Sequence, residues 1–359
     1  MIKSVLIANR GEIAIRIART ARRMGIKTYV VRTAKEPEAV YLSAADAVIN
    51  FPETDGNIPE FLDIDRLVGL AREYKIDSLH PGYGYLSENA ELAERCRDNG
   101  IVFIGPSPEV IRLMGDKVAA KGIAAQSGVP MLGASQGAVH TLDEARKIAK
   151  RLGYPVIIKA VSGGGGRGMR IVHHQDELEQ LYKIATAEAQ VAFNDPSVFI
   201  EKYLENPKHI EFQIVADNYG NVVHLGEREC SIQRKHQKLM EEAPSPALDE
   251  RLRKKMAAAA VSLAKQAGYQ SLGTVEFLLD HQKHFYFMEM NTRIQVEHPV
   301  TEEITGIDLV ELQFNIAAGR KLPLRQSQIH LNGWSIECRI NAEDVQAGFS
   351  PSIGIIRCL

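Results

Sequence analysis

The stretch that decides the fold reads Pro155-Val-Ile-Ile-Lys-Ala-Val161, then Ser162-Gly-Gly-Gly-Gly-Arg-Gly168, then Met169-Arg-Ile-Val172. Two apolar runs of strand length enclose glycines, which lack side chains and let several backbone N–H groups face one anion. In a dinucleotide fold or a P-loop, the glycine run leads into a helix. Here a second strand follows, so the sequence predicts a hairpin whose mobile tip folds down over phosphates. A plain flexible linker is the alternative for the loop alone.

The residues around this hairpin predict a small α+β lid. Lys159 favours the phosphate interpretation, because a lysine inside an apolar strand is costly unless it meets a charge. Thr141 and Glu144 have the spacing of a capping box, and Gly153 can end the helix expected over 145–152. A second helix is expected over 176–192 and a further strand over 197–203.

The first hundred residues alternate strand-like and helical segments. Strands are expected over 4–8, 27–32 and 101–104, and a helix over 12–24 ends near Gly25. This alternation of strands and helices predicts a parallel sheet with helices on both faces. Its first turn, Asn9-Arg10-Gly11-Glu12, lacks the three glycines of a dinucleotide fingerprint, which argues against nicotinamide or flavin binding.

Strands predominate over 211–291, apart from an Ala-rich helix over 250–267, and a further strand begins near Trp334. If the turn between strands 273–279 and 285–291 is centred between Gln282 and Lys283, Glu276 lies opposite Glu289. Their Cβ atoms would then be roughly 5 Å apart. Asn291 follows on the same face, and two carboxylates with an amide oxygen suit Mg²⁺. A solvated polar face is the alternative, and a register shift by one residue would separate the pair.

Two polar segments flank this proposed metal site. Arg293, Gln295 and Glu297 alternate with Thr292, Ile294 and Val296, a pattern that could hold a small planar oxyanion and remove its proton. Pro299 would rigidify the exit of this loop. The segment Glu229-Cys-Ser-Ile-Gln-Arg-Lys-His-Gln-Lys238 is either a solvated basic turn or, as we favour, an anion pocket.

Composition excludes several classes of protein. Hydrophobic residues make up 45% and charged residues 25% of the 359 residues, and the formal charge is −2. These values indicate a globular chain of two or three domains and argue against a nucleic-acid or membrane-surface role. No apolar run reaches the length of a membrane span or signal peptide. The four cysteines form no Cys-x-x-Cys pair, so we expect neither zinc nor disulfides and a cytoplasmic location.

Taken in order, several motifs closely resemble the biotin carboxylase component of biotin-dependent carboxylases, most of all that of bacterial acetyl-CoA carboxylase. They are Ile7-Ala-Asn-Arg-Gly-Glu-Ile-Ala14, His80-Pro-Gly-Tyr-Gly-Tyr-Leu-Ser-Glu-Asn89, Arg112-Leu-Met-Gly-Asp-Lys117, the glycine loop, the run from Gly226 to Lys238, the run from Glu289 to Pro299, and Glu337-Cys-Arg-Ile-Asn-Ala-Glu343. The resemblance covers residues 2 to about 354. It implies an α/β and α+β fold: a Rossmann-like parallel-sheet domain over 1–114, an ATP-grasp domain over 115–333 with a lid over about 131–203, and the start of a C-terminal domain over 334–359.

The resemblance also implies roles for individual residues. Nucleotide binding would fall to Lys117, Lys159, Gly165, Gly166, Glu201, Lys202, Tyr203, Leu204, His209, Gln233, His236, Glu276 and Glu289. Among these, Glu201, Lys202 and Leu204 would line the adenine pocket, and Gly165 and Gly166 would close over the phosphates. Mg²⁺ or Mn²⁺ would bind Glu276, Glu289 and Asn291. Bicarbonate would bind Lys238, Arg293, Gln295 and Val296, with Glu297 as its base, and Arg339 would stabilise the biotin enolate.

The implied reaction is the ATP-dependent carboxylation of biotin by bicarbonate through carboxyphosphate, which is the first half-reaction of acetyl-CoA carboxylase, an enzyme of fatty acid synthesis. No Ala-Met-Lys-Met motif occurs, so biotin would be attached to a separate carrier protein that works with a carboxyltransferase component. Propionyl-CoA, methylcrotonyl-CoA, pyruvate and urea carboxylases share these motifs. Another ATP-grasp ligase and a non-catalytic nucleotide-binding module are the alternatives from outside the family.

The sequence departs from the family's pattern in two places. The family's C-terminal domain continues beyond the point that corresponds to Leu359, and it contributes to the biotin side of the site and to the dimer interface. We therefore expect a truncated chain that keeps its ATP and bicarbonate sites, with weak or absent biotin turnover and with a monomer in place of the usual homodimer. Tyr41 also stands where the family often has histidine, for which we expect no chemical consequence.

Overall fold

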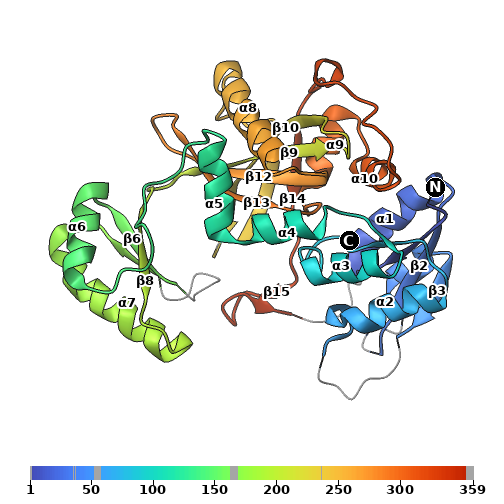
Figure 1. The fold of residues 1–359 in the computed structure, drawn as a ribbon, viewed down its shortest axis with the longest axis horizontal. Helices are drawn as coiled ribbons and strands as arrows, with labels where there is room; N and C mark the ends of the chain where they lie inside the picture. Colours follow the sequence, from blue (N-terminus) through green and yellow to red (C-terminus); the bar gives the residue numbers. More distant parts are fainter. Residues whose placement is uncertain are drawn as a thin grey trace.

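The computed structural model describes residues 2–34, 36, 38–51, 58–161, 169–235 and 237–352. It begins with a parallel five-stranded sheet in the order β3-β2-β1-β4-β5. Helix α1 covers one face, where Ile13 and Ile17 pack near Val5, and α2 and α3 cover the other face (Figure 1). The predicted doubly covered parallel sheet is confirmed. The bounds are β1 Ser4–Ile7, α1 Gly11–Arg23, β2 Lys27–Arg32, β3 Ala47–Asn50, α2 Ile64–Glu73, β4 Ser78–His80, α3 Ala90–Asp98 and β5 Val102–Phe103, with short 3₁₀ helices at Val40–Ala44 and Glu60–Leu62.

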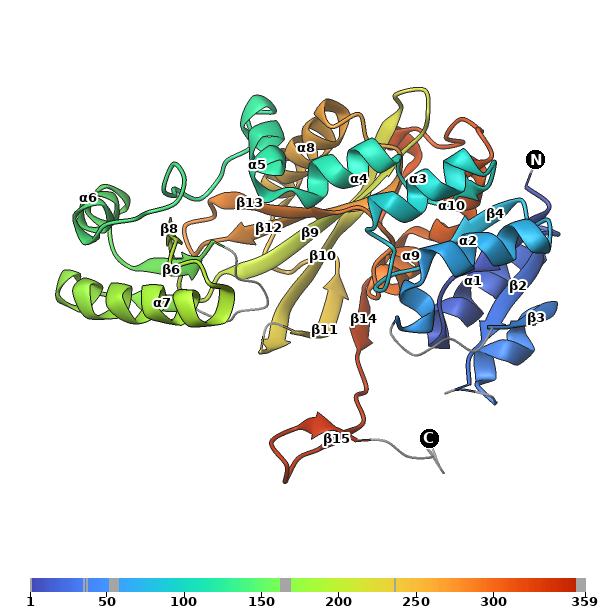
Figure 2. The ribbon, with the colours of Figure 1, turned by 60° about the horizontal axis from the view of Figure 1, so that its bottom comes forward.

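A small α/β unit follows two connecting helices, α4 (Pro108–Gly115) and α5 (Lys117–Gln126). Its antiparallel sheet has the order β7-β6-β8, and it stands apart from the larger sheet in both views (Figures 1 and 2). Thr141 and Glu144 form the predicted capping box of α6, and Gly153 lies at its C-terminal end. The bounds are α6 Leu142–Leu152, β6 Val156–Ala160, β7 Met169–Val172, a 3₁₀ helix Gln175–Glu177, α7 Leu178–Phe193 and β8 Val198–Lys202.

The pairing of β6 with β7 confirms that strands lie on both sides of the glycine run. Lys159 is paired with Met169, the first residue after the run. The run itself, 162–168, lies outside the described residues. The expectation of a strand rather than a helix after the glycines is therefore correct.

A six-stranded antiparallel sheet, in the order β13-β12-β9-β10-β11-β14, forms the centre of the chain. Along β9, Ile210 and Phe212 pack into the apolar core that α8 covers. Because side chains alternate along a strand, His209 and Glu211 point to the opposite face. The bounds are β9 Lys208–Ala216, β10 Val222–Arg234, β11 Gln237–Ala243, α8 Glu250–Gln266, β12 Ser271–Leu279, β13 Phe285–Asn291 and β14 Ser335–Cys338.

Two helices close one end of the polar face: α9 (His298–Thr305) and α10 (Leu309–Ala317). Pro299, which was expected to rigidify the exit of a loop, lies where that loop ends, in the first turn of α9. Proline is favoured there, since the N–H that it lacks would have no helical partner. A 3₁₀ helix, Gln326–Gln328, follows these two helices.

The last described residues lead away from the sheet. After β14, strands β15 (Glu343–Asp344) and β16 (Ser350–Pro351) pair as a short hairpin, which Figure 2 shows beyond the end of β14. Arg234 of β10 contacts this hairpin through an ion pair with Glu343. Over the described ranges, no helix is both long enough and apolar enough to cross a membrane.

Candidate active site

Two carboxylates face each other across the hairpin of β12 and β13. Glu276 is paired with Glu289, as predicted, although the turn is centred one half-residue earlier than expected. Phe277 pairs with Phe287, so Met288 is an extra residue on β13, a β-bulge that restores the predicted register at Glu276.

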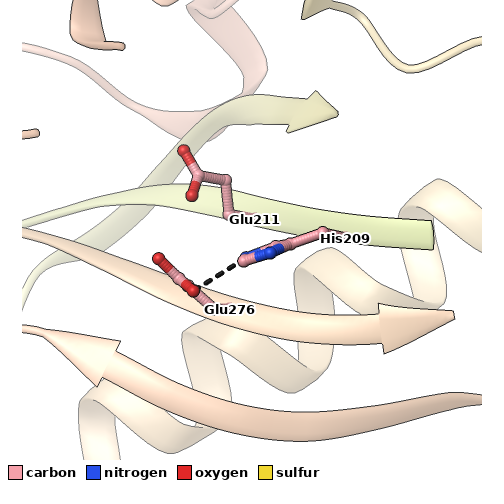
Figure 3. A group of neighbouring side chains, drawn as sticks. All are labelled: His209, Glu211 and Glu276. Atoms are coloured by element: carbon pink, nitrogen blue, oxygen red, sulfur yellow. Dashed lines mark hydrogen bonds and ion pairs between the residues drawn. The ribbon is translucent and has the colours of Figure 1, made fainter. Parts of the chain in front are cut away.

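Glu276 lies at the centre of a hydrogen-bond network and is 3% exposed. Its Oε2 contacts His209 Nε2 at 2.7 Å, as Figure 3 shows, and its Oε1 accepts from Asn291 Nδ2 at 2.8 Å and Lys238 Nζ at 3.0 Å. Burial alone would raise the pKa of Glu276, but Lys238 and the His209 contact hold it well below its ordinary value. Glu276 is therefore an ionised carboxylate.

Glu289 is the more open member of the pair, with an exposed side chain. The pKa of Glu289 is raised mainly by partial removal from water and, to a smaller extent, by repulsion from Glu276 and Glu88. Asn291, two positions further on, is 7% exposed and its Oδ1 accepts from Arg293 Nη2 at 2.9 Å. These three side chains offer the hard oxygen atoms that Mg²⁺ prefers, and a cation would relieve the repulsion between the carboxylates.

Lys238 of β11 joins this metal end to a second group of acids. Its Nζ donates to Glu211 Oε2 at 2.6 Å and to Glu297 Oε1 at 2.6 Å, in addition to Glu276. Burial would lower the pKa of Lys238, but Glu211, Glu276 and Glu297 together raise it. The ammonium group is thus charged and held among three carboxylates.

Glu297 lies directly before α9 and is 3% exposed. Its Oε2 accepts from Arg339 Nη2 at 3.1 Å. Burial would raise the pKa of Glu297, yet Lys238 and then Arg228 lower it to about 2. Glu297 is therefore an ionised carboxylate that faces two cations, Lys238 and Arg339.

Arg293 and Gln295 complete the predicted anion-binding segment. Arg293 Nε donates to Glu88 Oε2 at 2.9 Å, and Gln295 Nε2 donates to Glu276 Oε1 at 3.1 Å. Ile294 between them is fully buried in an apolar core, whereas Val296 is only half-buried. Gln295 and Glu297 are also buried, so burial does not alternate between polar and apolar side chains along this segment.

Comparison with known proteins identifies the family of this chain. Residues 1–111 match the family described as "Biotin carboxylase, N-terminal domain", and residues 116–325 match "Carbamoyl-phosphate synthase L chain, ATP binding domain". A curated relative from Nostoc sp., "Biotin carboxylase", is 54% identical over 352 residues, which are 98% of this chain and 78% of that protein. The chain belongs to the biotin carboxylase family.

Solved structures of this family have the same fold. The structure titled "Biotin Carboxylase-beta-gamma-ATP Complex from Campylobacter jejuni" matches with a TM-score of 0.89 and 48% identity, covering 98% of this chain and 78% of that one. The biotin carboxylase domain of the 2-oxoglutarate carboxylase from Hydrogenobacter thermophilus, in complex with Mg-ADP, ADP and bicarbonate, matches with a TM-score of 0.88 and 50% identity, covering 99% and 78%. The predicted resemblance and fold class are confirmed, as is membership of a family of ATP-grasp ligases.

The residues to which the biotin carboxylase resemblance gives nucleotide roles fall into two groups. On the small α/β unit, Lys159 Nζ contacts Glu201 Oε2 at 2.5 Å, and Lys121 Nζ contacts Glu201 Oε1 at 2.8 Å. Burial would raise the pKa of Glu201, but Lys159 and Lys121 lower it to about 2. Lys202 Nζ donates to the carbonyl oxygens of Gly153 and Tyr154, each at 2.9 Å.

The second group lies on the central sheet, where Gln233 Nε2 contacts His209 Nδ1 at 2.9 Å. Three other residues with expected nucleotide roles lie outside the central sheet. Lys117 is exposed at the start of α5, and Tyr203 and Leu204 are half-buried just after β8. We call Lys238 and the three carboxylates that it contacts, Glu211, Glu276 and Glu297, the Lys238 cluster. Among the residues that the structure describes, no hydrogen bond or ion pair joins the first group to this cluster. Gly165, Gly166 and His236 lie outside the described residues.

Arg339 follows β14 and bridges two acids, because its Nε donates to Glu241 Oε1 at 2.7 Å and its Nη2 to Glu297. Glu337, two residues before Arg339 in the sequence, lies opposite Glu241. Burial, then repulsion from Glu241 and Glu297, raises the pKa of Glu337 to about 7. The proposed biotin side of the site is therefore rich in carboxylates and has one arginine among them.

Sequence reasoning missed four residues of this site: Glu88, Glu211, Arg228 and Glu241. For two of these residues, the surrounding sequence has a pattern that could have indicated a buried polar site. Glu211 belongs to the run Lys208-His-Ile-Glu-Phe-Gln-Ile214, in which polar and apolar residues alternate as in a strand with one polar face. Arg228 stands between two acids, Glu227 and Glu229, within a strand that is otherwise mostly buried.

Proposed function

We propose that this chain catalyses the Mg²⁺- and ATP-dependent carboxylation of carrier-bound biotin with bicarbonate as the biotin carboxylase component of an acetyl-CoA carboxylase. One observation carries the proposal: Lys238 Nζ contacts both Glu276 and Glu297. A residue proposed to bind metal and a residue proposed to act as base therefore meet at one cation. Family relatives solved as a beta-gamma-ATP complex, or with Mg-ADP and bicarbonate, support the choice of ligands.

In this proposal, Glu297 removes the proton of bicarbonate. The Lys238 ammonium and the Arg293 guanidinium offset the negative charge of the anion, and Gln295 Nε2 offers it a hydrogen-bond donor. A bicarbonate oxygen then attacks the γ-phosphorus of ATP, which forms carboxyphosphate and releases ADP. Glu276, Glu289 and Asn291 would hold Mg²⁺, which neutralises phosphate charge during such a transfer.

Carboxyphosphate then breaks down to CO₂ and phosphate, and the phosphate takes the ureido proton of biotin. Arg339 offsets the charge of the resulting enolate, which captures CO₂. The half-buried position of Arg339 beside Glu297 supports this order, since both steps then occur around one carboxylate. The glycine loop and its lid would exclude water from carboxyphosphate.

Bicarbonate-dependent ATP hydrolysis, measured with and without Mg²⁺ and with and without free biotin, tests the reaction. Hydrolysis that needs both Mg²⁺ and bicarbonate is the expected result, and carboxybiotin is expected to form only slowly when biotin is added, because weak biotin turnover is expected from the sequence. Hydrolysis that is stimulated by an amino acid or amine instead of bicarbonate would indicate another ATP-grasp ligase. Binding of Mg-ATP without any hydrolysis would indicate a nucleotide-binding module.

The acetyl-CoA acceptor is tested by reconstitution. The chain is combined with the biotin carrier and carboxyltransferase of an acetyl-CoA carboxylase, and in parallel with those of a 2-oxo acid carboxylase. Malonyl-CoA formation in the first mixture alone is expected. Product formation in the second mixture alone would favour the 2-oxo acid alternative, which the 2-oxoglutarate carboxylase relative keeps open.

A further inference from the structure

Arg228 of β10 is a fully buried cation at the floor of the Lys238 cluster, with 0% of its surface exposed. All three of its nitrogens donate hydrogen bonds to other side chains. Nε donates to Glu211 Oε1 at 2.5 Å, Nη1 to Gln213 Oε1 at 2.8 Å and Thr301 Oγ1 at 3.0 Å, and Nη2 to Thr274 Oγ1 at 3.2 Å and Gln295 Oε1 at 3.4 Å. Burying such a charge is costly unless every donor is matched, as it is here.

This arrangement leaves Arg228 no donor for a ligand, and its burial keeps it from touching one. Any effect on the reaction must therefore pass through a neighbour. Two neighbours belong to the proposed bicarbonate site or contact it directly: Glu211 and Gln295.

The first connection is a carboxylate shared by two cations. Glu211, itself fully buried, accepts from Arg228 through Oε1 and from Lys238 through Oε2, the latter at 2.6 Å. Because Arg228 Nε holds Oε1, the other oxygen of the same carboxylate, Oε2, is directed to Lys238. Glu211 thus holds the Lys238 ammonium at one place in the site.

The second connection sets the orientation of an amide. A guanidinium has donors and no acceptor, so the Gln295 side chain must turn its oxygen toward Arg228. Its NH₂ group then faces the opposite way, where Nε2 donates to Glu276 Oε1 at 3.1 Å. Arg228 therefore presents a donor, and not an acceptor, to an anion in the site.

We propose that Arg228 is a positioning residue for bicarbonate, which fixes Lys238 through Glu211 and turns the donor end of the Gln295 amide into the site. The inference rests on the proposed function. A buried arginine with a purely structural role would affect folding and would change the apparent affinities for all substrates alike. A positioning residue instead changes the affinity for bicarbonate selectively.

The test uses Arg228→Lys, which keeps the charge and loses the fork. In bicarbonate-dependent ATP hydrolysis we expect the KM for bicarbonate to rise about tenfold, as for loss of one well-placed hydrogen bond, with the KM for Mg-ATP changed less than about twofold. The matched control is Arg253→Lys. Arg253 of α8 pairs at 2.9 Å with the fully buried Glu227, which lies next to Arg228 on β10. Neither Arg253 nor Glu227 contacts the Lys238 cluster. The control should leave both KM values unchanged.

A second variant keeps the test valid if Arg228→Lys does not fold. Thr301→Val removes one acceptor of Arg228 without removing charge or volume, and a smaller rise of about two- to threefold in the bicarbonate KM is expected. In a Gln295→Met background, Arg228→Lys should raise the bicarbonate KM by a smaller factor than in the wild type. Equal rises for bicarbonate and Mg-ATP, or factors that simply multiply in the double variant, would overturn the proposal.

A binding measurement separates this inference from the proposed function. Sodium bicarbonate, added with Mg-ADP, is expected to raise the unfolding temperature of the wild type and to raise that of Arg228→Lys less. If the wild type hydrolyses no ATP in response to bicarbonate, the proposed function fails, while a smaller bicarbonate-induced shift in the variant still supports the role of Arg228. Identical shifts in both proteins, including no shift in either, would overturn that role.

Discussion

Glu88 contacts Arg293 across 205 residues of sequence, with Arg293 Nε donating to Glu88 Oε2 at 2.9 Å. The other oxygen, Oε1, accepts from the backbone N–H of Thr292 at 2.9 Å. Glu88 belongs to the loop after β4, which Asn9 fixes through hydrogen bonds to the carbonyl oxygens of Pro81 and Tyr83. The N-terminal sheet thus determines where a residue of the proposed bicarbonate site lies.

We expect Glu88→Ala to raise the KM for bicarbonate about three- to fivefold, because Arg293 loses its anchor while the pair is partly open to water. Affinity for Mg-ATP, measured by calorimetry, should stay the same. Glu91→Ala is the control, since Glu91 is exposed on the adjacent α3. Equal effects of the two substitutions would show that the Glu88 contact does not position Arg293.

Glu289→Gln should weaken the Mg²⁺ dependence of ATP binding. The substitution keeps the shape of the side chain and removes the negative charge that lies opposite Glu276, where the two carboxylates would bind a cation together. We expect at least about a tenfold loss in ATP affinity with Mg²⁺ and little change without it. Glu303→Gln, on the exposed side of α9, is the comparison. A wild-type response to Mg²⁺ would refute the assignment of Glu289 as a ligand.

Stability should fall as the pH is lowered, partly because of His80. Burial lowers the pKa of His80 to about 3, while the unfolded chain titrates near 6.5. The unfolded state therefore binds more protons between these values, and the folded state loses about 1.4 kcal/mol from this residue between pH 7.5 and 5.5. Urea unfolding at both pH values should show a weaker pH dependence for His80→Gln. His281→Gln, at an exposed turn, should keep the wild-type slope.

The capping box of α6 predicts a local effect in the small α/β unit. Thr141→Ala removes the acceptor of the Glu144 backbone N–H and should destabilise α6 by about 1 kcal/mol. Amide hydrogen exchange would show faster exchange over Leu142–Leu152 and unchanged exchange in α8. Thr141→Ser keeps the hydroxyl and should restore protection. Equal exchange in all three proteins would mean that the cap contributes nothing.

Local patterns predicted much of the fold. Strand β2 was predicted with its observed bounds, and the capping box at Thr141 was read from spacing alone, since both depend on neighbouring residues. Helices α9 and α10 were not predicted. The alternating run up to Glu297 was interpreted as a loop, although Pro299 is typical of the first turn of a helix.

The site was predicted in part. Glu276, Glu289, Lys238 and Glu297 were assigned, and the structure brings Glu276 and Glu297 to one lysine. Glu88 could not be found by such reasoning, because its partner lies far away in sequence and no periodic pattern marks it. Arg228 was given no role although it stands between two acids, because its five contacts are to residues of β9, β12, α9 and the loop before α9, which are distant in sequence.

The bulge at Met288 separates the hairpin of β12 and β13 into two segments with different pairing. On the turn side, pairing follows from the loop at Asp280–His284, and on the site side it is held by the contacts of Glu276 and Asn291. A protein engineer could therefore lengthen or label that loop without moving the metal-binding carboxylates. Deleting Met288 would be the opposite kind of change, because one residue fewer would turn Glu289 to the wrong side of its strand while leaving the loop intact.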